Sequence, residues 1–185
     1  MFIRPRRNRK SEALRRLVRE HHLRVDDLIA PLFVIEGQDQ EVPVQSMPGQ
    51  FRYSLDRLLK KVGELQSLGI PCVSLFPALD ESLKDSRASE SWNPDGLYLR
   101  AVKEVKEKYP DMMVMTDVAM DPYSSDGHDG YVDPTSGEIL NDETLEILCS
   151  MALAQAKAGS DIVGPSDMMD GRVGAIRKGL DSENL

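Results

Sequence analysis

Four apolar runs alternate with longer amphipathic stretches along the chain. The runs cover residues 28–37, 72–77, 112–119 and 161–167. They are apolar nearly throughout instead of alternating with polar residues, which is typical of parallel strands covered by helices. Pro31 falls inside the first run, so we expect it near the start of that strand, because proline cannot donate to a sheet ladder. Residues 41–53 lack this pattern and are predicted to form a loop.

Leucine and valine recur at helical spacing between the runs. The predicted helices cover residues 12–20, 55–68, 94–109, 141–159 and 171–180. Their predicted N-caps are Ser11, Ser54, Asn93, Asn141 or Asp142, and Asp170. The order of elements is therefore a repeated β-α unit, which favours either a doubly wound open sheet or part of a (β/α)8 barrel.

Two observations bear on the choice between these folds. No glycine-rich phosphate-binding motif follows any strand, which disfavours a nucleotide-binding sheet. Polar residues cluster just after the third and fourth strands, where barrel enzymes hold their catalytic groups. A complete barrel needs eight units and about 250 residues, whereas this chain has four units in 185 residues.

The overall charge limits the choice of partners. The chain carries a net charge of −8 and has a pI near 4.9, which argues against binding to nucleic acid or to an anionic membrane. Its amino-terminal residues are basic, and we expect this arm to embrace an acidic neighbouring subunit: Arg4, Arg6, Arg7, Arg9 and Lys10. Neither a secretory signal nor a membrane-spanning run is recognisable, so a cytoplasmic location is expected. Cys72 and Cys149 are predicted to be free buried thiols.

An acidic segment, "TDVAMDPYSSDGHDGYVD" (116–133), follows the third strand. Asp117 at the strand end could hold a cationic or hydroxyl-bearing group, or it could cap the following turn. Carboxylates further along could form a Mg²⁺ or Ca²⁺ site together with His128: Asp121, Asp126, Asp129 and Asp133. Because their spacing does not match a known calcium loop, a solvated acidic loop is the favoured alternative, with His128 as a hydrogen-bonding loop residue.

The stretch "GPSDMMDGR" (164–172) follows the fourth strand directly. Ser166 and Asp167 would project over the top of a barrel, toward the polar groups of a substrate. Asp170 would serve as the N-cap of the last helix, with Gly171 in a turn.

Several motifs, in order and spacing, resemble the first part of the porphobilinogen synthase (delta-aminolevulinic acid dehydratase) family. The resemblance rests on "RPRRNRK…LRRLVRE", "PLFVIEG…SMPGQFRYS", "TDVAMDPYSSDGHDG" and "AGSDIVGPSDMMDGRVGAIR". It implies the amino-terminal half of a (β/α)8 TIM barrel with an extended arm. The expected boundaries are residues 1–24 for the arm and its short helix, and 25–185 for the first four β/α units.

The resemblance also implies a function. Members are lyases that condense two molecules of 5-aminolevulinate to porphobilinogen, with loss of water, early in tetrapyrrole and heme biosynthesis. They form homo-oligomers, typically octamers, through their arms. Asp117 matches the family's active-site aspartate, while Ser166, Asp167 and Asp129 are the expected substrate-binding residues.

The metal content expected from the resemblance differs from that of the zinc enzymes. Where one branch of the family has three cysteines, this sequence has Ala119, Asp121 and Asp129. A catalytic thiolate zinc site is therefore not expected. The sequence resembles the aspartate-type branch, which depends on Mg²⁺ or a monovalent cation, with Asp121 and Asp129 as candidate ligands.

The family's two Schiff-base lysines lie on strands five and six, which have no counterpart among these residues. Lys157 and Lys178 are predicted to lie on helices and do not replace them. The 185-residue chain is thus expected to be inactive alone, as the first part of a synthase or a half-length product. The alternative function is a non-catalytic half-barrel that binds a divalent cation or a partner subunit, with its first and fourth strands as open edges.

Overall fold

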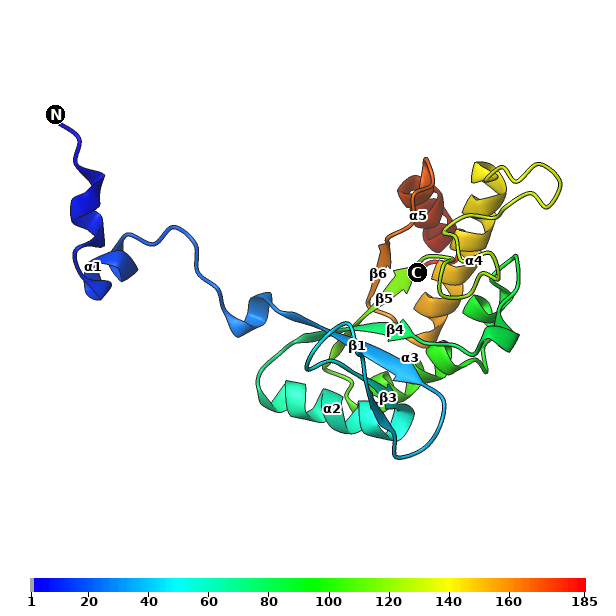
Figure 1. The fold of residues 1–185 in the computed structure, drawn as a ribbon, viewed down its shortest axis with the longest axis horizontal. Coiled ribbons are helices and arrows are strands. Elements are labelled where there is room, and N and C mark those ends of the chain that lie inside the picture. Colours follow the sequence, from blue (N-terminus) through cyan, green and yellow to red (C-terminus); the bar gives the residue numbers. More distant parts are fainter. Residues whose placement is uncertain (1) are drawn as a thin grey trace.

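The computed structural model describes residues 2–185, which form an extended amino-terminal segment and an α/β unit (Figure 1). The segment contains η1 (Pro5–Arg9), α1 (Glu12–Leu17) and η2 (Val25–Asp27), and nearly all of its side chains are exposed. Helix α1 was predicted to reach residue 20 but ends at Leu17. It buries no residue, so no packing stabilises a further turn of so short a helix.

The α/β unit contains the four predicted strands in parallel order. They are β1 (Ile29–Ile35), β4 (Cys72–Pro77), β5 (Met113–Val118) and β6 (Ile162–Pro165). The four long helices that follow them are α2 (Leu55–Ser67), α3 (Leu97–Lys108), α4 (Asn141–Ala158) and α5 (Arg172–Ser182). The predicted repeat of β/α units is confirmed.

The prediction of a loop over residues 41–53 is wrong. Two short strands, β2 (Glu41–Pro43) and β3 (Phe51–Ser54), pair antiparallel, and β3 runs parallel to β1 on the side away from β4. The last three residues of β1 are paired to β3, so β1 is not an open edge along its whole length, as had been expected. Only the first part of that edge, which includes Pro31, has no strand beside it among residues 2–185.

The predicted N-caps of three helices are wrong, although α4 begins at residue 141 as expected. Helix α3 begins at Leu97, because the side chain of Asn93 instead accepts the amide of Asp95 in a preceding turn. The residues at the N-cap positions of α4 and α5 are Leu140 and Gly171. Asn141 and Asp170, which had been expected there, bond to each other, since the Asn141 side chain accepts the amide of Asp170 and donates to its carbonyl. These two hydrogen bonds join the start of α4 to the loop before α5.

The two faces of the sheet differ in what covers them. Helices α2, α3 and α4 pack against one face, where Val34, Val73 and Val114 are completely buried. On the other face Ile29 is 48% exposed and Met113 is 41% exposed. Within the described residues this second face has no covering layer, so the groups that lie on it can reach a ligand or another part of a barrel.

The two cysteines do not form a disulfide with each other. Cys72 and Cys149 are both free, the first buried and the second half-buried. Over residues 2–185, no helix combines the length and the apolar character that a bilayer crossing requires.

Candidate active site

Asp117 lies near the carboxyl end of β5 on the uncovered face of the sheet. Side chains along β5 alternate between the faces, so Val114, Thr116 and Val118 are buried under the helices while Asp117 is half-buried on the other side. Ser166, directly after β6, donates a 2.6 Å hydrogen bond from its hydroxyl to Oδ1 of Asp117. The structure thus brings together two of the predicted site residues across neighbouring strands.

These two residues stand at the rim of a pocket of about 330 Å³, formed by the carboxyl ends of β4, β5 and β6. The lining residues are Ser74, Phe76, Met115, Asp117, Gly164, Pro165 and Ser166. A Cβ at position 164 would lie 2.6 Å from Cε of Met115, so a larger residue there would require the flexible end of that methionine to shift. A small pocket with apolar walls and a carboxylate at one edge suits a small ligand that carries a cationic or hydrogen-bonding group.

The pKa of Asp117 is raised above its ordinary value. Burial is the largest cause, and the negative charges of Asp129 and Asp167 add to it, while the hydrogen bond from Ser166 opposes it. Among the described residues no lysine, arginine or histidine forms an ion pair with it. A positive group brought in by a ligand would therefore meet a carboxylate that lacks a counter-charge.

Asp167 was predicted to bind substrate beside Ser166, but it lies outside the lining of this pocket. Its side chain is completely buried, where Oδ1 accepts the amide of Met169 at 2.7 Å and Oδ2 lies 3.2 Å from Nε of Arg172. Burial raises the pKa of Asp167, with Arg172 lowering it and Asp129 raising it. The structure gives Asp167 a role in fixing the turn before α5, and its contact with substrate stays a prediction.

Asp121 and Asp129 form a carboxylate pair in the loop between β5 and α4. The pKa of Asp121 is raised, first by burial and then by the charge of Asp129 and a hydrogen bond with its carboxyl group. Two carboxyl groups can share a hydrogen bond only if they hold a proton, so the pair is suited to take up either a proton or a cation.

The carboxylates of Asp121 and Asp129 suit one kind of metal and not the other. A pair of carboxylates fits Mg²⁺, which commonly keeps several waters and uses one or two protein carboxylates. It does not fit a thiolate zinc site, since Ala119 is 2% exposed and has no ligand atom. The described residues contain no group of three or more metal-binding side chains.

Two of the other candidate ligands have structural contacts of their own. Asp133 accepts the amides of Thr135 and Ser136, and Nδ1 of His128 accepts the amide of Gly130 at 3.1 Å. The prediction that His128 bonds within its loop is confirmed. Lys157 and Lys178 lie on α4 and α5, as predicted.

Sequence reasoning missed two residues that contact the backbone of Asp117. The hydroxyl of Tyr98 accepts its amide at 2.9 Å, and the side-chain amide of Gln155 donates to its carbonyl at 2.7 Å. Both side chains are buried on helices that cover the sheet. In the sequence, each of these residues is only a side chain with a polar atom at an inward-facing helical position. That pattern does not show which backbone group the polar atom contacts.

Comparison with known proteins decides the family. The model of the family described as "Delta-aminolevulinic acid dehydratase" matches residues 2–185. The chain belongs to the delta-aminolevulinic acid dehydratase family. It is 51% identical over 185 residues to the dehydratase of Bradyrhizobium diazoefficiens, covering 100% of this chain and 52% of that protein. It is also 51% identical to the chloroplastic enzyme of Selaginella martensii, covering 96% of this chain and 42% of the relative.

A solved structure supports the same assignment. The dehydratase of Toxoplasma gondii ME49, in complex with its reaction product porphobilinogen, matches with a TM-score of 0.95 and 54% identity. The match covers 100% of this chain and 52% of that one. The present sheet and helices are therefore a partial (β/α)8 barrel, and the chain spans about half the length of these dehydratases.

Proposed function

We propose that this protein takes part in the condensation of two 5-aminolevulinate molecules to porphobilinogen, with loss of water. Membership of the dehydratase family and likeness to a product-bound dehydratase support this. The observation that carries the proposal is the half-buried Asp117 carboxylate at a small pocket, bonded to Ser166 and without a cationic neighbour in residues 2–185. The ammonium group of 5-aminolevulinate supplies the charge that Asp117 lacks.

The proposed roles follow from the positions of the side chains. Asp117 holds the substrate amino group, and the Ser166 hydroxyl orients the carboxylate while offering a hydrogen bond to the ligand. Asp129 and Asp167 add negative potential, since both act on the pKa of Asp117. Apolar walls from Phe76 and Met115 would contact the carbon chain of the substrate.

The activity belongs to the whole length of the family's proteins, of which this chain spans about half. The resemblance places the two Schiff-base lysines on strands five and six of the barrel. A lysine that forms an imine with the substrate ketone supplies covalent catalysis. In this proposal residues 2–185 provide the acidic, amine-binding part of the site, and the lysines come from the following strands.

We also propose the aspartate-type cation dependence for this protein, without catalytic zinc. Asp121 and Asp129 would hold Mg²⁺ or a monovalent cation, which would neutralise the carboxylate pair near Asp117. Activity should then survive a zinc-selective chelator and fall when Mg²⁺ and monovalent cations are exchanged for a bulky organic cation. The variant Asp121→Asn should weaken the response to the cation.

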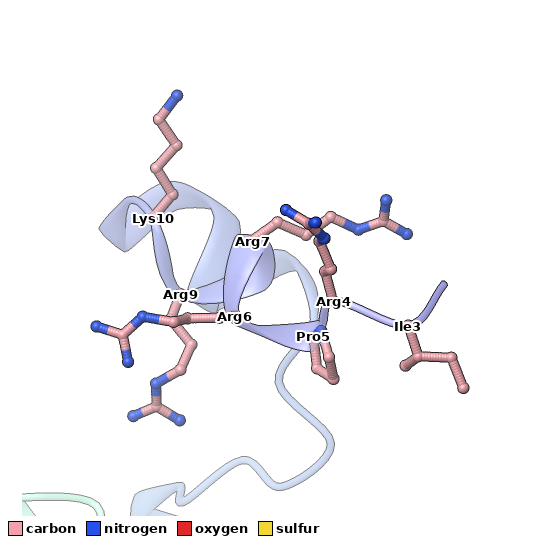
Figure 2. A pocket seen from close by; sticks show the side chains of 7 residues that line it. All are labelled: Ile3, Arg4, Pro5, Arg6, Arg7, Arg9 and Lys10. Carbon is pink, nitrogen blue, oxygen red and sulfur yellow. The ribbon is translucent and has the colours of Figure 1, made fainter. Parts of the chain in front are cut away.

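The amino-terminal arm, residues 1–24, is proposed to join subunits in a homo-oligomer such as an octamer. Figure 2 shows its basic side chains spreading in several directions from the short η1 helix. Such a surface is complementary to an acidic neighbour, and the rest of this chain is acidic. Light scattering of a variant without residues 1–24 should give a smaller particle than the intact protein.

A non-catalytic half-barrel that binds a cation or a partner subunit is the second candidate function. The exposed apolar side chains on the uncovered sheet face, Ile29 and Met113 among them, favour it, because such a surface binds another polypeptide. A cytoplasmic location stays a prediction, and several relatives are named as chloroplastic.

The two functions are separated by assaying the complete gene product that carries this chain. Porphobilinogen formation from 5-aminolevulinate, together with a borohydride-trapped substrate adduct, is the expected result. A protein that forms neither, yet binds a cation or a partner chain, would favour the non-catalytic half-barrel. An adduct on residues 2–185 themselves would contradict the placement of the lysines on later strands.

A further inference from the structure

Strands β4 and β5 part at the position of Asp117. The last pair in their register is Leu75 with Thr116. Earlier in the ladder, the amide of Met113 donates to the carbonyl of Pro71, and the same offset sets the amide of Asp117 opposite the carbonyl of Leu75. Regular pairing with β4 therefore ends just before Asp117, although β5 stays paired to β6 there, so the backbone groups of Asp117 that face β4 need other partners.

The Tyr98 hydroxyl reaches both backbone groups at this position. It donates to the carbonyl of Leu75 at 2.7 Å and accepts the amide of Asp117 at 2.9 Å. Tyr98 is 2% exposed and comes from α3, so its ring reaches the sheet from the helix-covered side. Burial raises the pKa of this hydroxyl, so it keeps its proton and donates at neutral pH.

The carbonyl of Asp117 has no backbone donor on β4. In a parallel ladder of this offset it faces residue 77 of β4, and that residue is proline, which has no amide hydrogen. The side chain of Gln155 supplies the missing donor from α4 at 2.7 Å. Gln155 is completely buried and its Oε1 has no partner among the described residues, so the bond to Asp117 is the one hydrogen bond its side chain makes there.

We propose that Tyr98 and Gln155 are positioning residues that fix the peptide of Asp117, and through it the carboxylate, for the reaction proposed above. The inference rests on that proposed function, in which Asp117 binds the substrate amino group. Asp117 is held at both its amide and its carbonyl, so the two peptide groups that flank its Cα have little freedom to rotate and the side chain keeps its direction toward the pocket and Ser166. Such second contacts matter because small misplacements of a reacting group lower rates strongly.

A buried tyrosine near Asp117 does not necessarily bond to its backbone. The ring of Tyr123 lies 6.3 Å from that of Tyr98 and is equally buried, yet its hydroxyl has no partner among the described residues. Tyr109 offers the opposite comparison, because it lies at the carboxyl end of α3, the end opposite to Tyr98, and its hydroxyl donates to the carbonyl of Leu59 at 2.9 Å. Tyr109→Phe is thus a matched control that loses the same kind of bond away from the site.

The test uses Tyr98→Phe, Gln155→Met and Tyr109→Phe in the complete gene product that carries this chain. Tyr98→Phe and Gln155→Met should each lower kcat by about ten- to a hundred-fold and also raise KM, because a displaced Asp117 binds the substrate amine less well. Tyr109→Phe should lower the melting temperature and leave kcat unchanged. Equal losses of kcat in Tyr98→Phe and Tyr109→Phe, or none in Tyr98→Phe and Gln155→Met, would overturn the proposal.

A double-mutant cycle with Asp117→Asn asks whether the effect passes through Asp117. If Tyr98 acts by positioning that carboxylate, Tyr98→Phe should cost little further activity once Asp117 is replaced. Independent, additive losses would show that Tyr98 does not act through Asp117.

A readout without turnover separates this inference from the proposed function. The carboxyl ¹³C resonance of Asp117 should shift in Tyr98→Phe and in Gln155→Met, and its amide should exchange faster in Tyr98→Phe, while Tyr109→Phe leaves both unchanged. If the wild-type protein forms no porphobilinogen, the proposed function fails and these measurements still decide the positioning role. An unmoved Asp117 resonance in both variants would refute it.

Discussion

The carboxylates at the two ends of β5 differ in whether a cationic side chain lies beside them. At the amino end, Asp161 accepts the amide of Val114 at 2.8 Å and lies 2.9 Å from the ammonium of Lys106. That ammonium also donates to the carbonyls of Pro110 and Met112. At the carboxyl end, Asp117 has the Ser166 hydroxyl and further carboxylates as neighbours. The carboxylate at the amino end is thus paired with a cation of the protein, whereas the carboxylate at the carboxyl end can be paired by a cationic ligand.

This difference separates a structural acid, Asp161 just before β6, from a functional one, Asp117 in β5, at opposite ends of the same strand β5. A paired carboxylate stabilises the fold, and its replacement should affect stability more than chemistry. A carboxylate whose pKa is raised by burial and like charges costs stability at neutral pH, a pattern common at functional sites.

The largest effect is expected for Asp117→Asn. Porphobilinogen formation should fall by about a hundred-fold or more, because the amine-binding charge is lost while the shape of the side chain is kept. The control Asp161→Asn should keep its kcat and unfold at a lower urea concentration. If Asp161→Asn lost activity as Asp117→Asn does, the division between the two ends would be wrong.

The next effect concerns the stability of the amino end. Lys106→Met should lower the free energy of unfolding by about 2 kcal/mol, since a largely buried ammonium with several acceptors is removed. Lys157→Met is the control: this lysine pairs with Glu183 on the surface, and its loss should cost about 0.5 kcal/mol. Urea denaturation measures both, and equal losses would contradict the account.

A pH-dependent effect should distinguish the carboxyl end. Because the folded-state pKa of Asp117 is raised, the folded protein binds this proton more tightly than the unfolded chain does. The contribution of Asp117 to stability is present at low pH and lost as pH rises through its folded pKa. Asp117→Asn should therefore melt higher than wild type at about pH 7, and this advantage should disappear at about pH 4.

The reverse pH trend would indicate that Asp117 is stabilised as an anion. An advantage of Asp117→Asn that grows as the pH falls would contradict its raised pKa. Thermal melts of wild type and variant in the same buffers give the comparison, because carboxylates that do not interact with Asp117 titrate alike in both proteins.

The smallest effect is expected for Ser166→Ala. Loss of one hydrogen bond to the Asp117 carboxylate should lower kcat/KM by about five-fold. Ser160, at the other end of β6, bonds to the carbonyls of Val114 and Ile162 and is the matched control. Ser160→Ala should change the melting temperature and leave kcat/KM as it is, and the opposite assignment of effects would reverse the roles of the two ends.

The parallel strands could be predicted from sequence because each is a short run buried on the helix side and bounded by turns. The pairing of β2 and β3 could not, since segments of three and four residues are held by tertiary contacts instead of by their own propensity. The meeting of Asp117 and Ser166 was predictable, because the carboxyl ends of parallel strands share one edge.

Other features of the site needed the structure. Asp167 follows Ser166 directly, but only the position of Arg172 reveals that its side chain turns away from the pocket into an ion pair. Tyr98 and Gln155 resemble ordinary core residues until the register places Pro77 opposite the Asp117 carbonyl. In each case a long-range contact, which has no local sequence pattern, decides the role.

The most direct measurement compares binding of 5-aminolevulinate with binding of levulinate, which lacks the amine, to the complete gene product and to its Asp117→Asn variant. If the unpaired acid at the carboxyl end of β5 recognises the amine, the wild-type protein should bind 5-aminolevulinate more tightly than levulinate, and the variant should bind both alike. A variant that keeps the full preference for the amine would show that this carboxylate does not hold the cationic group of the ligand.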